Sequence, residues 1–248
     1  MGKERTRWAS GEFLMARLLV HVEGETEESF VNEILRDHLL GFGYEHVCAR
    51  LLGNARQRSR RGGIRAWPSV REDIVRHLKE DRHRVVTTMV DYYALPQTGE
   101  RAWPGRAEAA LQVHAQKTAV ISQAIAADIG AVMGEDFNSS RFIPFVVMHE
   151  FEGLLFSDCL RFCKGIGRMD LVAQFQNIRD AFSSPEEIND SPETAPSKRV
   201  EALIPGYQKP LMGTLAALEI GLEKIRDACP HFNNWLSQIE AFGLLHPA

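Results

Sequence analysis

The sequence predicts an α/β fold: a mainly parallel, four-stranded sheet flanked by helices, with a C-terminal helical extension. Four runs of β-branched and other apolar residues alternate with segments of helical spacing, and this alternation is typical of parallel sheets with right-handed crossovers. The chain has 248 residues, of which 44% are apolar and 25% charged. These values are typical of a globular protein large enough to bury a core.

The expected strands and helices follow from the spacing of the apolar residues. The expected strands span residues 17–22, 46–52, 84–93 and the start of 141–156. The expected helices begin after Gly24 and span 68–80 and 106–130, with Gly130 as a C-terminal cap. The run 84–93 is almost entirely apolar or β-branched, as expected for a strand that is covered on both faces.

Changes in composition divide the chain into three parts. Residues 1–14 are expected to form a loose leader, and Met15 could equally be the start. Residues 15–182 are the α/β domain. Residues 183–248 begin with a linker rich in Ser, Pro and acids, and continue as two helices broken at Pro230, which we expect to act as a lid or brace.

The composition also excludes several classes of protein. The net charge of −4 argues against a surface coated with positive charge, although it leaves room for a local basic region. The four cysteines form no C-x-x-C pair, so reduced thiols are expected rather than a zinc knuckle or a disulfide framework. No apolar stretch approaches the roughly 20 residues that span a bilayer. We therefore expect a cytoplasmic protein without a membrane partner.

Three of the four expected strands end in acidic residues. These acids are Glu23, Asp91, and the pair Glu150 and Glu152. Ligands of open α/β sheets gather at the carboxyl ends of the strands, so these side chains are the main candidates for a functional site. Carboxylates without clustered His or Cys favour Mg²⁺ or Mn²⁺ over zinc. A buried carboxylate at Asp91 would also need a partner, because an unpaired buried charge is costly.

Several acids have a structural explanation as well. Glu25, Glu27 and Glu28 lie in the first turn of an expected helix, where negative charge offsets the helix dipole by about 0.3–1 kcal/mol each. Glu150 is as well explained by helix capping as by function. Glu150 and Glu152 would point roughly 200° apart if both were helical, so a helix that begins between them would admit one of the two to the site.

Short motifs in this order resemble those of the Toprim, or topoisomerase-primase, fold. The stretch "VEGETEESF" resembles its first motif, and "MVDYYALP" its second, which normally carries two aspartates two residues apart. With "MHEFEGLLFSD", "SPETAPSKR" and "GLEKIRDACPHFNNW", the chain is similar from about Met15 to a bacterial Toprim-like family of unknown function. Its members are often encoded beside ATPases, in settings that suggest phage defence.

The resemblance implies roles for individual residues. Glu23 takes the place of the Toprim glutamate, a general acid/base candidate and metal ligand, and Asp91 that of the first metal-binding aspartate. Tyr93 stands where the second aspartate is expected. Glu152 matches an acid of related Toprim-like nucleases and could replace that ligand, with Glu150 as a weaker candidate.

Basic residues provide candidates for contacts with nucleic acid. The candidates in one Gly-ended, acid-free stretch are Arg56, Arg58, Arg60, Arg61 and Arg65. Such a stretch can follow a phosphate backbone by charge, or it can be a solvated loop or a docking site for an acidic protein. In "PSKR", Lys198 could neutralise charge on a reacting phosphate and Arg199 could contact nucleic acid, although both could simply begin a helix. Lys209 is a weaker candidate.

These features predict a Mg²⁺- or Mn²⁺-dependent nuclease, or a nuclease subunit gated by an ATPase partner, that acts on DNA or RNA. Tyr93 motivates one alternative, a catalytically silent Toprim-like regulatory or nucleic-acid-binding subunit. A nucleotidyl transferase is disfavoured because no nucleotide-binding Gly/Lys loop is present.

Overall fold

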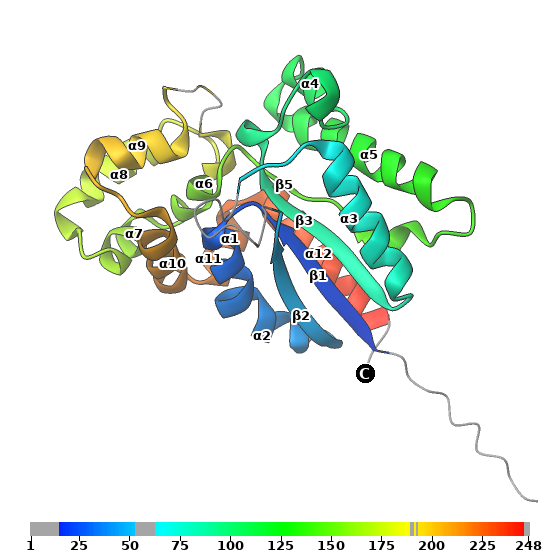
Figure 1. Cartoon of the computed structure of the whole chain (residues 1–248). Coiled ribbons are helices and arrows are strands. Elements are labelled where there is room, and N and C mark those ends of the chain that lie inside the picture. Colours follow the sequence, from blue (N-terminus) through cyan, green and yellow to red (C-terminus); the bar gives the residue numbers. More distant parts are fainter. Residues whose placement is uncertain (1–14, 53–62, 189–190, 192, 246–248) are drawn as a thin grey trace, which may run out of the picture.

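A computed structural model describes residues 15–52, 63–188, 191 and 193–245 of the chain. A parallel sheet lies at its centre, with the strand order β2-β1-β3-β4 and with β5 also paired to β3 (Figure 1). The strands are β1 (Ala16–Val22), β2 (Tyr44–Leu51), β3 (Arg84–Asp91), β4 (Phe142–Ile143) and β5 (Val146–Val147). The predicted α/β class, with a mainly parallel sheet flanked by helices, is confirmed.

Alternate residues of each strand point to opposite faces of the sheet, and helices cover both faces. Leu18, Val20 and Val22 of β1 belong to one hydrophobic cluster, whereas Leu19 belongs to the other. The first cluster is completed by residues of α1 (Glu25–Phe30), a π-helical turn at Val31–Leu35, α2 (Arg36–Leu40) and α12 (Pro230–Leu245). The second is completed by α3 (Trp67–Glu80) and α5 (His114–Met133).

A further group of helices lies beyond the carboxyl ends of β1 and β3 (Figure 1). These helices are α6 (Phe151–Leu155), α7 (Cys159–Gly165), α8 (Val172–Arg179), α9 (Pro196–Leu203) and α10 (Lys209–Ile220). Helix α11 (Leu222–Ala228) connects them to α12, and α4 (Arg106–Ala110) precedes α5. Short 3₁₀ turns lie at Tyr92–Ala94, Gly99–Arg101, Ser139–Arg141, Met169–Leu171 and Pro185–Glu187. Helix α10 packs against α7 and against α1, the helix that begins the connection from β1 to β2.

Three predicted elements are divided differently in the structure. The fourth strand is two short strands separated at Pro144, which has no N–H for the ladder. The helix expected over 106–130 is two helices, and the second continues past Gly130 to Met133. The structure has three helices, α10, α11 and α12, where two were expected at the C-terminus. The additional break lies at Gly221, whose φ of 81° ends α10, and the expected break lies just before Pro230.

The last helix is part of the main core. The indole Nε1–H of Trp235 donates to Thr87 Oγ1 of β3 at 2.8 Å, and its ring stacks on Phe145 with centroids 4.4 Å apart. Helix α12 therefore covers one face of the sheet, and its residues belong to the same cluster as β1. The predicted leader, residues 1–14, lies outside the described residues. Within the described ranges no helix has the length and apolar character needed to cross a membrane.

Candidate acidic site

The backbone brings three of the predicted acids to one edge of the sheet. Strands β1 and β3 are parallel neighbours. Glu23 directly follows β1 and Asp91 is the last residue of β3, so the two residues lie at adjacent strand ends. The backbone N–H of Asp91 donates to Glu23 Oε2 at 3.2 Å, and the N–H of Phe151, the first residue of α6, donates to Asp91 Oδ1 at 2.9 Å. The ends of two strands and the start of α6 are therefore joined through these carboxylates.

Glu152 enters the same site from the first turn of α6. Glu152 is only 2% exposed, and its Oε2 accepts a hydrogen bond from Lys209 Nζ at 3.1 Å. Lys209 begins α10, 57 residues further along the chain, and its side chain is 40% exposed. The contact of α10 with α1 and α6 places this cation against the acids.

Glu27 is a member of the site that the sequence assigned first to the start of a helix, with metal binding as a minor alternative. It is buried, and its Oε2 accepts the backbone N–H of Gly24 at 3.0 Å, so it also has the expected capping role. The neighbouring Glu25 is exposed. The signal was the helical period: Glu27 lies three residues before Phe30, on the face that packs into the core.

Burial and mutual repulsion raise the pKa values of these carboxyls. Burial raises the pKa of Glu23 to about 7, and the charges of Glu150 and Glu152 add to this effect. Burial likewise raises the pKa of Glu27 to about 7, with Glu23 and Glu152 contributing. The pKa of Asp91 is raised well above its ordinary value, first by burial and then by Glu23, Glu27 and Glu152. Glu23 and Glu27 are therefore partly protonated near neutral pH.

Lys209 opposes this accumulation of negative charge. Burial lowers its pKa, but Glu152, Asp91 and Glu150 outweigh that effect and raise the pKa above its ordinary value. Burial raises the pKa of Glu152 above its ordinary value, and the nearby Lys209 offsets only part of this rise. Lys209 thus stays charged at neutral pH and compensates part of the buried charge.

The donor types in the site fit a hard cation, because carboxylate oxygens are the ligands that Mg²⁺ and Mn²⁺ prefer. In the part of the chain that the structure describes, however, no three His, Cys, Asp or Glu side chains form a group arranged to hold a metal ion. The acids are connected through backbone N–H groups and through charge. Coordination of one ion would require their side chains to turn toward a common centre.

The comparisons with known proteins identify a family. Residues 22–240 match the model of a domain of unknown function, DUF4276. The chain belongs to this family. No curated protein and no solved structure matches the chain. The DUF4276 match begins one residue before Glu23 and contains every acid of the site together with Lys209.

Glu150 lies at the boundary of the acidic site of this DUF4276 chain. Helix α6 begins at Phe151, between the two glutamates, and so directs them apart. Glu150 Oε2 accepts the backbone N–H of Ser197 at 2.8 Å, in the first turn of α9. The side chain of Glu150 makes no capping hydrogen bond to its own helix α6 and instead satisfies an N–H in the first turn of α9, while its charge raises the pKa of Glu23 and Glu152.

The structure places the other predicted residues around the site with partners of their own. Tyr93 lies in a 3₁₀ turn and donates its backbone N–H to the His149 carbonyl at 3.2 Å. Lys198 is exposed and pairs with Glu201 at 2.7 Å, one turn along α9. Arg199 donates from Nε to the Thr194 carbonyl at 2.9 Å. Lys209, ranked behind Lys198 from the sequence, is the lysine that contacts a buried acid.

The described part of the arginine-rich stretch is anchored beside Glu23. Arg65 pairs with Asp73 at 3.1 Å, whereas Arg56, Arg58, Arg60 and Arg61 lie outside the described residues. On one flank, the N–H of Leu52 donates to the Val22 carbonyl at 2.9 Å, and on the other the N–H of Gly63 donates to the Glu23 carbonyl at 2.9 Å. Both flanks are thus attached to the end of β1.

Proposed function

We propose that this DUF4276 protein hydrolyses phosphodiester bonds with Mg²⁺ or Mn²⁺ at the acidic site, as a nuclease or a nuclease subunit. One observation carries the proposal: carboxylates from separate segments meet at the carboxyl end of a parallel sheet, Glu152 buried and Glu23 and Asp91 half-buried, and their pKa values are raised. Buried like charges are costly unless protons or a cation compensate them. A divalent cation would provide that compensation.

The residues have separable roles in this proposal. Glu23, Asp91 and Glu152 would hold the cation, which supplies Lewis acidity toward phosphate oxygens. Glu27 lies close enough for its charge to act on Asp91. Glu23, with a pKa of about 7, is suited to accept or donate a proton at neutral pH. Lys209 could turn from Glu152 toward a phosphate oxygen and stabilise the negative charge that develops there.

The Toprim resemblance supports the same assignment as part of the proposal. Glu23 follows the central strand β1 and Asp91 ends its neighbour β3, as the resemblance implies. Tyr93 replaces the second aspartate, and Glu152 is proposed to take over its role because its charge acts on both Glu23 and Asp91. A defence-type setting in the cytoplasm, with an ATPase that gates activity, belongs to this proposal.

Nucleic acid, either DNA or RNA, is the proposed substrate. Both flanks of the arginine-rich stretch are fixed to the end of β1, next to the acid proposed for catalysis. Arg56, Arg58, Arg60, Arg61 and Arg65 are therefore proposed to attract the phosphate backbone toward Glu23, with Arg199 as a more distant contact. Lys198, paired with Glu201, is proposed to act only if that ion pair opens.

A silent regulatory subunit is the second candidate, and two observations favour it. Tyr93 supplies no carboxylate at the second aspartate position, and the described acids do not form a ready-made group of metal ligands. Such a subunit would bind nucleic acid through the same basic stretch but would not cleave it.

A cleavage assay separates the two candidates. Purified protein is incubated with plasmid, single-stranded DNA and RNA in the presence of Mn²⁺, alone and with an ATPase encoded beside it. We expect cleavage by the wild type, a loss of at least a hundredfold in Glu23→Gln and Asp91→Asn, and no loss in the matched control Glu28→Gln. Binding without cleavage in every sample would support the silent subunit. Equal cleavage by all variants would exclude the acidic site as its source.

A further inference from the structure

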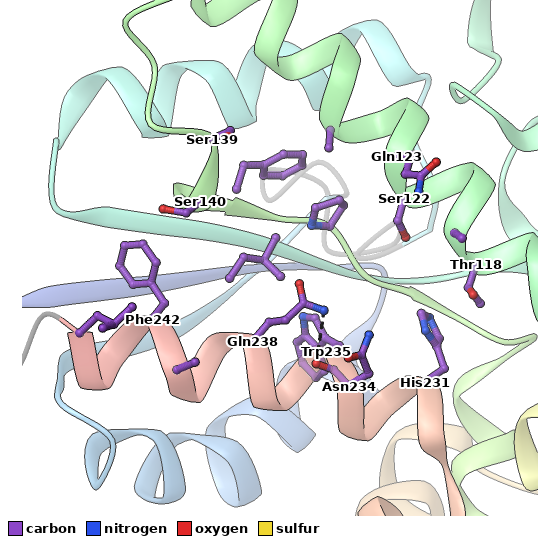
Figure 2. A pocket seen from close by; sticks show the side chains of 17 residues that line it. Thr118, Ser122, Gln123, Ser139, Ser140, His231, Asn234, Trp235, Gln238 and Phe242 are labelled. Atoms are coloured by element: carbon purple, nitrogen blue, oxygen red, sulfur yellow. Dashed lines mark hydrogen bonds between the residues drawn. The ribbon is translucent and has the colours of Figure 1, made fainter.

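A second concave site lies away from the acids, between helices α5 and α12 (Figure 2). It encloses about 650 Å³, a volume within the range of small-molecule sites. Its floor is the edge of the sheet at Phe142, Ile143 and Pro144. The site shares no described lining residue with the acidic cluster, so it is independent of the function proposed above.

The lining combines flat apolar surfaces with uncharged polar groups. Phe142, Pro144, Trp235 and Phe242 provide the apolar surfaces. Polar side chains labelled in Figure 2 come from three segments: Thr118, Ser122 and Gln123 from α5, Ser139 and Ser140 from the 3₁₀ turn before β4, and His231, Asn234 and Gln238 from α12. The described lining contains no Asp, Glu, Lys or Arg. An ion bound here would lose its hydration without a compensating charge, so an uncharged ligand is favoured.

Several of these polar groups have hydrogen-bonding capacity to spare. Ser122 Oγ is buried and has no hydrogen-bond partner among the described residues. Gln238 donates from Nε2 to the Asn234 carbonyl at 3.3 Å, which leaves its Oε1 as an acceptor. Buried polar groups are normally satisfied, so an unpaired hydroxyl at the wall of a pocket is an indication of a missing partner.

The histidine of the lining is neutral under ordinary conditions. Burial lowers the pKa of His231 to about 4. Its Nε2 lies 3.0 Å from the Val146 carbonyl, which fixes the proton on that nitrogen. The pocket therefore keeps an uncharged lining at neutral pH.

We propose that this pocket binds an uncharged nitrogen heterocycle of the size of a purine base or nucleoside. Side-chain amides present a donor and an acceptor together, the pattern that pairs with the edge of a purine ring. The amides of Gln123 on α5 and of Asn234 and Gln238 on α12 belong to the lining, and the aromatic and proline surfaces can pack against the faces of the ring. A purely apolar ligand would leave the buried Ser122 hydroxyl without a partner.

Calorimetric titration of the full chain with adenine, adenosine and guanosine tests this proposal, with 2-naphthol as an apolar ligand of similar size. We expect at least one purine compound to bind more tightly than 2-naphthol. Gln238→Leu and Asn234→Leu, both at exposed positions, should weaken its affinity at least tenfold, and the exposed Gln174→Leu on α8 should not change it. Ala126→Phe, which fills the pocket, should abolish binding.

Three results would overturn the proposal: no binding of any purine compound, tighter binding of 2-naphthol, or purine binding that Gln238→Leu and Ala126→Phe leave unchanged. Circular dichroism and thermal unfolding establish that each variant is folded. If one amide variant does not fold, the other amide variant together with Ala126→Phe decides the outcome.

Discussion

Replacing Glu27 by glutamine should stabilise this protein at high pH and have little effect at low pH. Glu27 is buried, and its pKa rises from 4.5 to about 7 because burial and the neighbouring acids disfavour the charged form. The folded state thus holds a proton more tightly than the unfolded state. The corresponding stability is fully present below pH 4.5 and is lost as the pH rises through about 7.

The size of the effect follows from the shift. One pKa unit corresponds to about 1.4 kcal/mol, so charging Glu27 costs the folded protein up to roughly 3 kcal/mol above neutral pH. Glutamine is uncharged, and its Oε1 can still accept the Gly24 N–H. We therefore expect Glu27→Gln to raise the free energy of unfolding by about 2 kcal/mol near pH 8.5 and by about zero near pH 4.5.

Urea unfolding followed by circular dichroism at the two pH values measures this difference. The matched control is Glu25→Gln, in the same first turn but exposed; losing its charge at the helix start should lower stability by at most about 1 kcal/mol near pH 8.5, the opposite direction to Glu27→Gln. The reasoning is refuted if Glu27→Gln is no more stable than the wild type near pH 8.5, or if the gain is the same at both pH values.

Two further substitutions test other parts of the structure. Lys209→Met leaves the buried Glu152 without its cation and should destabilise the protein near neutral pH. The expected loss is only about 2 kcal/mol, because Lys209 is partly exposed and water screens the ion pair. Adding Glu152→Gln should restore most of this loss in a double-mutant cycle. Gly243→Ala places a methyl group against the Phe42 carbonyl and the Tyr44 ring, and should lower the free energy of unfolding by about 1–3 kcal/mol. Unchanged urea midpoints would show that α10 or α12, respectively, packs differently.

The fold was predictable where apolar runs are continuous. Residues 17–22 and 84–93 are dominated by such residues, and both correspond to strands. The division of the fourth strand was missed because the apolar run continues through Pro144, although proline interrupts the ladder. The break at Gly221 was missed because Gly also occurs inside helices, and only its positive φ identifies it as a terminator.

The acidic site was partly predictable for a physical reason. Glu23 and Asp91 follow from topology, because adjacent parallel strands bring their carboxyl ends together. Glu27 was interpreted first as the start of a helix, with metal binding a minor alternative, since its burial depends on how α1 packs. Lys209 could not be ranked above Lys198, because its contact with Glu152 spans 57 residues and depends on the position of α10. The pocket between α5 and α12 depends likewise on tertiary packing.

Calorimetric titration with Mn²⁺ tests most directly whether Glu23, Asp91 and Glu152 act as one cation site. We predict that the wild type binds Mn²⁺ near pH 7 and releases protons, because Glu23 and Glu27 are partly protonated there. Asp91→Asn should weaken the affinity at least tenfold, while Glu28→Gln should leave it unchanged. An absence of Mn²⁺ binding, or equal affinity in the wild type and Asp91→Asn, would contradict the account.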